Sequence, residues 1–353
     1  MLREIDVTGF RAFERLNVRG LGRINLIVGQ NNSGKTCLLE AIELLGARSV
    51  APLQTQAQRR GEPFIVPVHG QMVLGLVLRY VLHGYSAGEG AGFRISGRDG
   101  GERTIEASIA RTPAGIVAPV LYLQPPVVAQ PSMFLRTKAS DGLEVSFPIF
   151  GEDFLPATPP PWSVGPSSSM SYVGTGPVGA AEAVRAWSAV VLKPEQALVL
   201  EAMRIVEPRI EDAAIALLPS QNQTLSVKLE GVDGGVPLGS LGECTGRILS
   251  LAGSLVEARS GILLVDEIDR GLHVSTMEKM WKLAIETARK LDVQLFATTH
   301  SDDCLRGLAK YLRSAQEAGE GVVLLRLDRG RTEPTLYRPE EIVLGAESTI
   351  EVR

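Results

Sequence analysis

Apolar and polar positions change their pattern several times near the start of the chain. Residues 2–10 alternate, which predicts a strand with one buried face. Residues 23–28 become apolar at successive positions, as in a strand buried on both faces of a sheet. The turn-rich stretch 29–34 follows, and apolar residues then recur at helical spacing over 38–45. Because Gly46 is a typical helix end, the pattern predicts strand, glycine-rich loop and helix in that order.

The last third of the chain alternates between helix and strand patterns. Residues 243–258 and 277–284 carry apolar side chains at helical spacing. Residues 262–265, 295–298 and 322–327 are short, wholly or mostly apolar runs, typical of buried strands. Alternating helices and buried strands predict an α/β fold with a mostly parallel central sheet.

The middle of the chain follows a different pattern. Short runs rich in Val, Ile, Leu and Tyr at 62–82 and 93–125, separated by glycines, predict antiparallel strands. Residues 156–179 are rich in Pro, Ser and Gly and predict a loop. Residues 180–218 return to helical spacing, interrupted by prolines, and 224–232 predict another strand.

Composition and charge narrow the class of protein. The 353 residues are 44% apolar and 22% charged, and the net charge of −4 means that any nucleic-acid binding needs a local basic patch. Cys37, Cys244 and Cys304 are far apart in the sequence, which argues against a disulfide framework or a zinc site. The first residues lack the apolar region of a signal peptide, and no apolar run approaches the roughly 20 residues that span a bilayer. We expect a cytoplasmic protein without a membrane segment.

The segment GQNNSGKT fits the template G-x-x-x-x-G-K-[ST] at every fixed position. Glycines let backbone N–H groups point at phosphate oxygens, and the following helix adds its positive N-terminal end. Lys35 is expected to reach the β- and γ-phosphates, and Thr36 to ligate Mg²⁺. A chance match in a glycine-rich loop is the alternative, but the flanking strand and helix favour the nucleotide loop. The candidate nucleotide-binding residues are Gly29, Asn31, Asn32, Ser33, Gly34, Lys35, Thr36 and Cys37.

The segment GILLVDEID places two carboxylates after a buried strand, at the edge of a parallel sheet where α/β proteins bind ligands. Asp266 is expected to hold Mg²⁺, and Glu267 to act as the general base on the attacking water. An exposed acidic turn would show the same letters, so this motif depends on the nucleotide loop upstream. His300 follows the next buried strand, where it could contact the γ-phosphate or simply be a solvated turn residue.

The segment LGSLGE opens the predicted helix at 243–258. Ser240 followed three residues later by Glu243 fits a capping box, which needs no nucleotide. The same helix N-terminus could instead hold the γ-phosphate of a second molecule's nucleotide.

These elements, in this order, resemble an ABC-type ATPase. The segments FRAFERLNV, LLVDEIDRGLHVS and FATTHS resemble most the AAA15/AAA21-type ATPases, a branch related to the OLD (overcoming lysogenization defect) nucleases and to ATPase subunits of two-component phage-defence systems. The resemblance covers residues 1–50 and about 195–353. It implies that Ser240, Gly242 and Glu243 are the signature, Asp269 the D-loop and His300 the catalytic switch; Leu241 and Cys244 depart from the small residues usual there. Gln124 is the candidate for the Q-loop.

The resemblance also implies an architecture and partners. Residues 1–50 and 236–353 would form the ABC ATPase core, 51–155 an antiparallel β lobe, and 156–235 a loop and helical insertion. Two ATP molecules, each with Mg²⁺, would lie between two subunits of a homodimer, and a higher oligomer stays open. About 50 residues follow His300, too few for a further domain of typical size, so the resemblance points to a separately encoded effector such as a Toprim nuclease.

Other functions fit parts of the pattern. A DNA-repair or chromosome-maintenance ATPase of the RecF or SMC type is the main alternative, and the arginines at 3, 11, 15, 19 and 23 could form a DNA-facing stripe or a solvated, charge-balanced strand face. A transporter motor does not need about 230 residues between the nucleotide loop and the carboxylates. A small-molecule kinase gives no role to the signature-like segment or to His300.

Overall fold

The computed structural model describes residues 1–62, 64–68, 71–111, 118–120, 127–129, 133–156, 169–217, 223–315 and 319–347. These residues form two compact units that interleave along the chain. The first unit consists of Met1–Leu21, Asn31–Ser168 and Leu327–Pro334. The second consists of Gly22–Gln30, Ser169–Arg326 and Thr335–Arg353.

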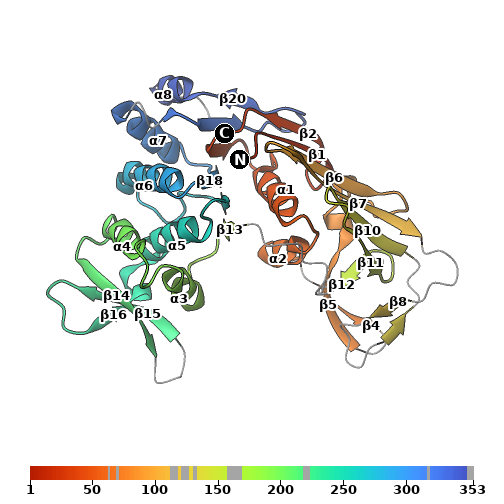
Figure 1. Cartoon of the computed structure of the whole chain (residues 1–353), viewed down its shortest axis with the longest axis horizontal. Coiled ribbons are helices and arrows are strands. Elements are labelled where there is room, and N and C mark those ends of the chain that lie inside the picture. The colour runs from red at the N-terminus through yellow and green to blue at the C-terminus, as the bar shows by residue number, and fades with distance from the viewer. Residues whose placement is uncertain are drawn as a thin grey trace. The chain divides into compact units, whose positions relative to one another are not determined.

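The first unit is built on a six-stranded antiparallel sheet in the order β11-β10-β7-β6-β1-β2. Helix α1 packs against β1, β6 and β7 (Figure 1). At Gly97 a side chain would collide with Leu2 and Leu45, so glycine allows the helix to approach the sheet. The strands and helices of this unit are β1 (Glu4–Phe10), β2 (Phe13–Arg19), α1 (Lys35–Ala47), α2 (Pro52–Arg59), β4 (Phe64–Val68), β5 (Gln71–Val77), β6 (Gly92–Arg98), β7 (Glu102–Arg111), β8 (Ala118–Val120), β9 (Val127–Ala129), β10 (Met133–Ala139), β11 (Glu144–Ile149) and β12 (Phe154–Pro156).

The second unit contains the predicted parallel sheet. Its order is β13-β17-β18-β3-β19-β20, and every pairing is parallel except that of β20. Strands β3 and β18 are buried at every position, as their continuous apolar runs predict. The strands are β3 (Ile24–Val28), β13 (Met170–Val173), β17 (Ile262–Val265), β18 (Gln294–Thr298), β19 (Val322–Arg326) and β20 (Thr335–Tyr337).

Helices of the second unit share one hydrophobic core with this sheet. Helix α5 packs against α3, α4 and α6, and the fully buried Trp187 and Trp281 fill space on α3 and α6. The indole Nε1 of Trp281 donates to the Cys304 carbonyl at 2.9 Å, which ties α6 to α7. The helices are α3 (Ala180–Ser188), α4 (Gln196–Arg204), α5 (Glu243–Glu257), α6 (Met277–Lys290), α7 (Asp302–Ser314) and α8 (Pro339–Glu347).

The predicted α/β fold class, with a mostly parallel sheet and a separate antiparallel lobe, is confirmed. Two local predictions are wrong. The helical pattern over 180–218 ends at Arg204, and β14 (Ile210–Leu217) instead forms a small antiparallel sheet with β15 (Gln223–Leu229) and β16 (Gly235–Pro237). Within the segment predicted as a loop, Met170–Val173 forms β13, the edge strand beside β17. Among the described residues, no helix has both the length and the hydropathy to cross a bilayer.

Candidate functional site

The loop at residues 29–36 has a backbone that few side chains tolerate. Gly29, Asn32 and Gly34 have φ angles of 139°, 61° and 99°, all in the region that favours glycine or asparagine. Helix α1 starts at Lys35 with Gly34 as its N-cap, and no side chain caps it. The first N–H groups of α1 are therefore not satisfied by a capping side chain, which suits the binding of an anion.

Packing within the first unit constrains residues 31–36 of this loop. A Cβ atom added to Gly34 would lie 2.6 Å from the Phe13 ring, so the start of β2 packs directly against the loop backbone. Lys35 and Ser33 are only 5% and 6% exposed. The hydroxyl of Ser33 is buried without a hydrogen-bond partner. A buried hydroxyl in this state costs free energy unless a ligand satisfies it, and a phosphate oxygen would do so.

A group of charges surrounds the buried carboxylate of Glu40 on α1, one turn after the loop. Glu40 is 1% exposed, and its two oxygens lie 2.8 Å from Arg11 Nε and 2.7 Å from Arg60 Nε. Arg60 also donates to the Cys37 Sγ at 3.4 Å. Burial, with a smaller effect from Glu40, raises the pKa of Cys37, so its thiol stays protonated. Since the Cys37 side chain faces these charges, we expect only its backbone N–H to serve a nucleotide.

The second unit places both predicted carboxylates at the carboxyl end of β17. Asp266 is 9% exposed, and its Oδ1 accepts from the Thr298 hydroxyl at 2.6 Å. The same Thr298 oxygen accepts from the Glu267 N–H at 2.8 Å. The backbone of this turn is also tied to the neighbouring strands, because Asp266 N donates to Val173 O at 2.9 Å and Ile268 N to Thr298 O at 3.0 Å. Asp266 is thus oriented by a second residue, as is usual for metal-binding carboxylates.

Glu267 is held in a strained conformation. Its φ angle is 51°, in the left-handed region that non-glycine residues rarely adopt. Its backbone carbonyl accepts from the Arg247 guanidinium at 2.9 Å, and its carboxylate lies 3.1 Å from Arg270. Burial lowers the pKa of Arg247, and the nearby Glu182 partly offsets this effect. Strained residues that are fixed by their surroundings cluster at active sites, so this geometry fits the predicted general base.

The next strand brings further predicted residues to the same edge of the sheet. The Thr299 hydroxyl donates to Asp269 Oδ1 at 2.5 Å, and its N–H donates to Ile27 O at 3.2 Å. His300 is exposed directly after β18. Because β3, β17 and β18 run parallel, residues 29–30, Asp266 and His300 all leave the sheet at its carboxyl edge. This is the edge where open α/β sheets bind ligands.

The segment before α5 is not a capping box. The N-cap is Gly242, at a φ angle of 86°, and no side chain caps the helix. Ser240 instead belongs to a 3-10 helix at Leu238–Leu241, and this tight turn removes it from the capping position. Ser240, Gly242 and Glu243 are all exposed at the helix N-terminus. Cys244 donates to the Gly271 carbonyl at 2.5 Å, which links α5 to the turn after Asp269.

The donor set suits Mg²⁺ with a bound triphosphate. In the part of the chain that the structure describes, no three His, Cys, Asp or Glu side chains gather to form a metal cage. Magnesium takes one or two protein oxygens and fills its other positions with phosphate and water, so a carboxylate such as Asp266 does not need a cage of three protein ligands. Gln124, the predicted Q-loop residue, lies outside the described residues.

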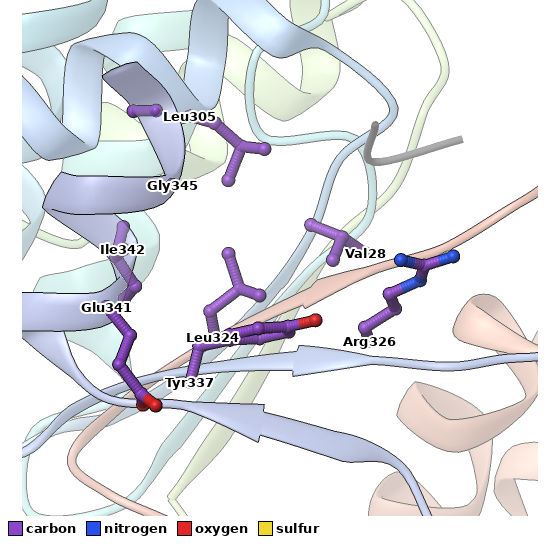
Figure 2. Close-up of a pocket in the computed structure, with 9 residues that line it drawn as sticks. Val28, Leu305, Leu324, Arg326, Tyr337, Glu341, Ile342 and Gly345 are labelled. Atoms are coloured by element: carbon purple, nitrogen blue, oxygen red, sulfur yellow. The ribbon is translucent and has the colours of Figure 1, made fainter. Parts of the chain in front are cut away.

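Two other surfaces offer no alternative phosphate site. A cavity of about 40 Å³ beside the end of β3 is lined mainly by apolar side chains of β3, β19, α7 and α8, with Arg326 and Glu341 among its polar members (Figure 2). The predicted arginine stripe is divided: Arg11 is buried, and Arg23 pairs with Asp292 in the second unit. Only Arg15 and Arg19 lie exposed on one face of β2.

Three residues of this site were not singled out from the sequence. Thr298 appeared only as a letter in the segment FATTHS, although a threonine next to a catalytic turn is a signal that could have found it. Arg270 follows Asp269 directly, and the spacing of three residues from Glu267 allows an ion pair in a tight turn. Arg247 gave no sequence signal, because it lies among apolar residues inside α5.

Comparison with protein families gives two partial matches. Residues 181–305 match the family described as "AAA domain, putative AbiEii toxin, Type IV TA system". Residues 1–63 match a family of proteins of unknown function (DUF2813). The first match includes the signature-like segment, the carboxylate turn and His300, and the second includes the nucleotide loop.

Comparison with individual proteins gives one relative along the whole chain and others along a short stretch. The chain is 21% identical to an ATP/GTP phosphatase of Helicobacter pylori, over 97% of each protein. A stretch of 74 residues is 39% identical to the DNA replication and repair protein RecF of Pseudomonas paraeruginosa, covering 21% of this chain and only 20% of that protein. Among solved structures, the SMC head domain of Thermotoga maritima has a TM-score of 0.45 at 13% identity, covering 96% of this chain and 98% of that one.

Proposed function

We propose that this chain is an ABC-type ATPase that binds Mg-ATP through residues 29–36 and hydrolyses it with Glu267. The observation that carries the proposal is the Asp266–Thr298–Glu267 arrangement at the carboxyl edge of the parallel sheet, where the nucleotide loop also begins. The full-length similarity to an ATP/GTP phosphatase and the match to an AAA domain support hydrolysis of a nucleotide. The buried, partnerless hydroxyl of Ser33 supports a ligand at the loop.

Each residue then has one task. The loop backbone and Lys35 bind the phosphates, and Thr36 and Asp266 hold Mg²⁺, which neutralises phosphate charge when bound. Glu267 accepts a proton from the attacking water. His300, at the end of β18, is proposed to contact the γ-phosphate. Ser240, Gly242 and Glu243 are proposed to bind the γ-phosphate held by a second copy of the chain, with Asp269 as the D-loop residue beside them.

Two variants test the reaction. Lys35→Ala should weaken ATP binding by about 10- to 100-fold, because it removes a charge-assisted contact of about 1.5–3 kcal/mol. Glu267→Gln should bind ATP normally and hydrolyse it at least about 100-fold more slowly, as expected when a general base is lost. Phosphate release and the equilibrium binding of a fluorescent ATP analogue measure the two effects. Lys279→Ala, at an exposed position on α6, is the matched control.

We further propose that ATP binding closes a homodimer that controls a separately encoded effector, such as a Toprim nuclease, in phage defence. The resemblance to the OLD-related branch and the family description naming an AbiEii toxin support this role. Cells that carry the chain with its neighbouring genes should lower phage plating efficiency, and Lys35→Ala should remove the protection. Equal plating with and without the parental genes would rule the defence role out.

DNA repair is the second candidate, favoured by the 39% identical stretch shared with RecF. Exposed Arg15 and Arg19, together with Arg94 and Arg98 on β6, offer basic groups on one face of the antiparallel sheet. Direct binding to duplex DNA should weaken linearly with the logarithm of salt concentration, with a slope set by the number of phosphates contacted. Salt-dependent duplex binding without phage protection would favour repair over defence.

A further inference from the structure

A buried arginine on α5 contacts the backbone of both predicted catalytic carboxylates. Arg247 is 3% exposed. Its Nη2 donates to the carbonyls of Asp266 and Glu267 at 2.8 and 2.9 Å. Its Nη1 donates to the carbonyl of Gly174, in the turn between β13 and α3. Three backbone carbonyls thus accept hydrogen bonds from Arg247. Its planar guanidinium can donate in several fixed directions at once.

Glu267 is held by Thr298 as well as by Arg247. The Glu267 N–H donates to the Thr298 hydroxyl at 2.8 Å, and its carbonyl accepts from Arg247. Both peptide groups that flank the Glu267 Cα are therefore held, one from β18 and one from α5. Glu267 has an unfavourable φ angle of 51°. These hydrogen bonds keep the residue in this conformation, which an unrestrained turn would not retain. The direction of the Glu267 side chain follows from that φ angle.

We propose that Arg247 is a positioning residue that sets the orientation of the general base Glu267 and links it to α5, the helix that begins at the signature segment. The proposal rests on the proposed ATPase function. It gives a role to the buried Arg247, which has no catalytic contact of its own. Through Arg247, α5 is connected to the residue that is proposed to activate water. A shift of α5 at its N-terminus would reach Glu267 through the Arg247 guanidinium.

Loss of the positioning contacts should lower the rate of hydrolysis without lowering affinity for ATP. Arg247→Met keeps most of the side-chain volume and removes the donors, so kcat should fall by about 10- to 100-fold, as for other residues that orient a catalytic group. KM and the equilibrium binding of a fluorescent ATP analogue should stay within about twofold of the parent. Arg247→Lys retains one charged donor group and should recover part of kcat. Arg259→Met, just beyond the end of α5 and paired at the surface with Glu195, is the control and should keep the parental kcat.

A double variant separates positioning from general damage to the fold. If Arg247 acts through Glu267, then Arg247→Met should not further lower the residual rate of Glu267→Gln, because the affected group is already gone. Multiplicative losses in the double variant would overturn the proposal. So would a parental kcat in Arg247→Met, or a raised KM with unchanged kcat. If Arg247→Met does not fold, the same comparison is made with Arg247→Lys, alone and combined with Glu267→Gln.

Failure of the inference about Arg247 can be distinguished from failure of the proposed ATPase function. A parental protein that releases no phosphate would contradict the proposed function and this inference together. A parental protein that hydrolyses ATP, loses activity in Glu267→Gln and keeps it in Arg247→Met would contradict the inference alone.

Discussion

Positive φ angles occur at several residues on which the proposed chemistry depends, and Gly34 and Glu267 show two different reasons for them. For Glu267 the left-handed conformation costs about 1–3 kcal/mol, which the contacts from Thr298 and Arg247 offset. For Gly34 the conformation itself costs little, since glycine has no Cβ. The two positions therefore differ in what a substitution would do: at Gly34 any side chain is excluded, whereas at Glu267 the side chain is needed.

Gly34→Ala should impair the nucleotide loop. The new Cβ atom would meet the Phe13 ring at 2.6 Å, at a φ angle of 99° that alanine rarely adopts. We expect a loss of about 1–3 kcal/mol in unfolding free energy and at least tenfold weaker ATP binding, measured by urea unfolding and by a fluorescent ATP analogue. Gly101→Ala, outside the proposed site, is the control, because a Cβ there meets open space. Normal ATP affinity in Gly34→Ala would mean that the loop geometry described here is not required.

Thiol chemistry at the three cysteines should follow burial. Burial raises the pKa of Cys37 and of Cys304, so below those raised values both remain thiols and react slowly. Cys244 is only half-buried. Iodoacetamide at pH 8 should therefore modify Cys244 first in the native protein, and Cys37 and Cys304 only after unfolding, as followed by mass spectrometry. Cys244→Ser should abolish the native modification; rapid labelling of Cys37 would contradict the buried charge cluster.

Helix α1 couples the nucleotide loop to a buried ion cluster through Glu40. Its side chain is 1% exposed and pairs with the buried Arg11 and the partly exposed Arg60, so Glu40→Gln leaves the buried Arg11 without its nearest carboxylate. Breaking a buried ion pair in this way costs about 3–5 kcal/mol. Urea unfolding should show this loss in Glu40→Gln. Glu43→Gln, on the same helix and paired with Arg59, which is more exposed than Arg11, should lose about 0–1 kcal/mol. Equal losses in the two variants would show that burial does not decide the effect.

Most elements of the fold follow from the sequence pattern, and the exceptions have identifiable causes. Strands β3 and β18 are apolar throughout, and α5 is a long amphipathic helix, so pattern alone places them. Strand β13 has only four residues in a segment rich in Pro, Ser and Gly, and its identity depends on pairing with β17. In β14 the apolar residues Ile210, Ala213, Ala214 and Leu217 follow helical spacing, and pairing with β15 overrides that pattern.

The candidate site was predictable where backbone chemistry restricts residue type. The glycines of the loop and the carboxylates after a buried strand are such positions: the loop leads into α1 without a side-chain cap, and Asp266 follows β17, while their roles stay a prediction. The contacts of Arg247 and Thr298 could not be predicted, since they join residues far apart in sequence and a polar residue in a helix or strand can equally face solvent.

At the scale of the whole molecule, the chain passes between two compact units several times. The nucleotide loop itself crosses from the second unit into the first between Gln30 and Asn31. The predicted division at residues 50, 155 and 235 describes functional segments and stays a prediction, while the compact units are cut elsewhere along the chain. Ionic and packing contacts therefore stabilise each unit through segments that are distant in sequence, such as Arg23 and Asp292 in the second unit.

Assembly is the last property to which the site points. One chain supplies one nucleotide loop and one signature segment, and the exposed N-terminus of α5, with Ser240 and Gly242, has no capping side chain. We predict that Glu267→Gln with Mg-ATP sediments as a dimer, because binding without hydrolysis retains the closed state. Adding Ser240→Arg should restore the monomer while leaving ATP affinity unchanged, since the arginine blocks the surface offered to a second chain. Gln223→Arg, at an exposed position at the start of β15, is the charge-matched control and should still dimerise. A Glu267→Gln protein that stays monomeric at saturating Mg-ATP would contradict the shared-nucleotide dimer, and hydrolysis would then be a property of the single chain.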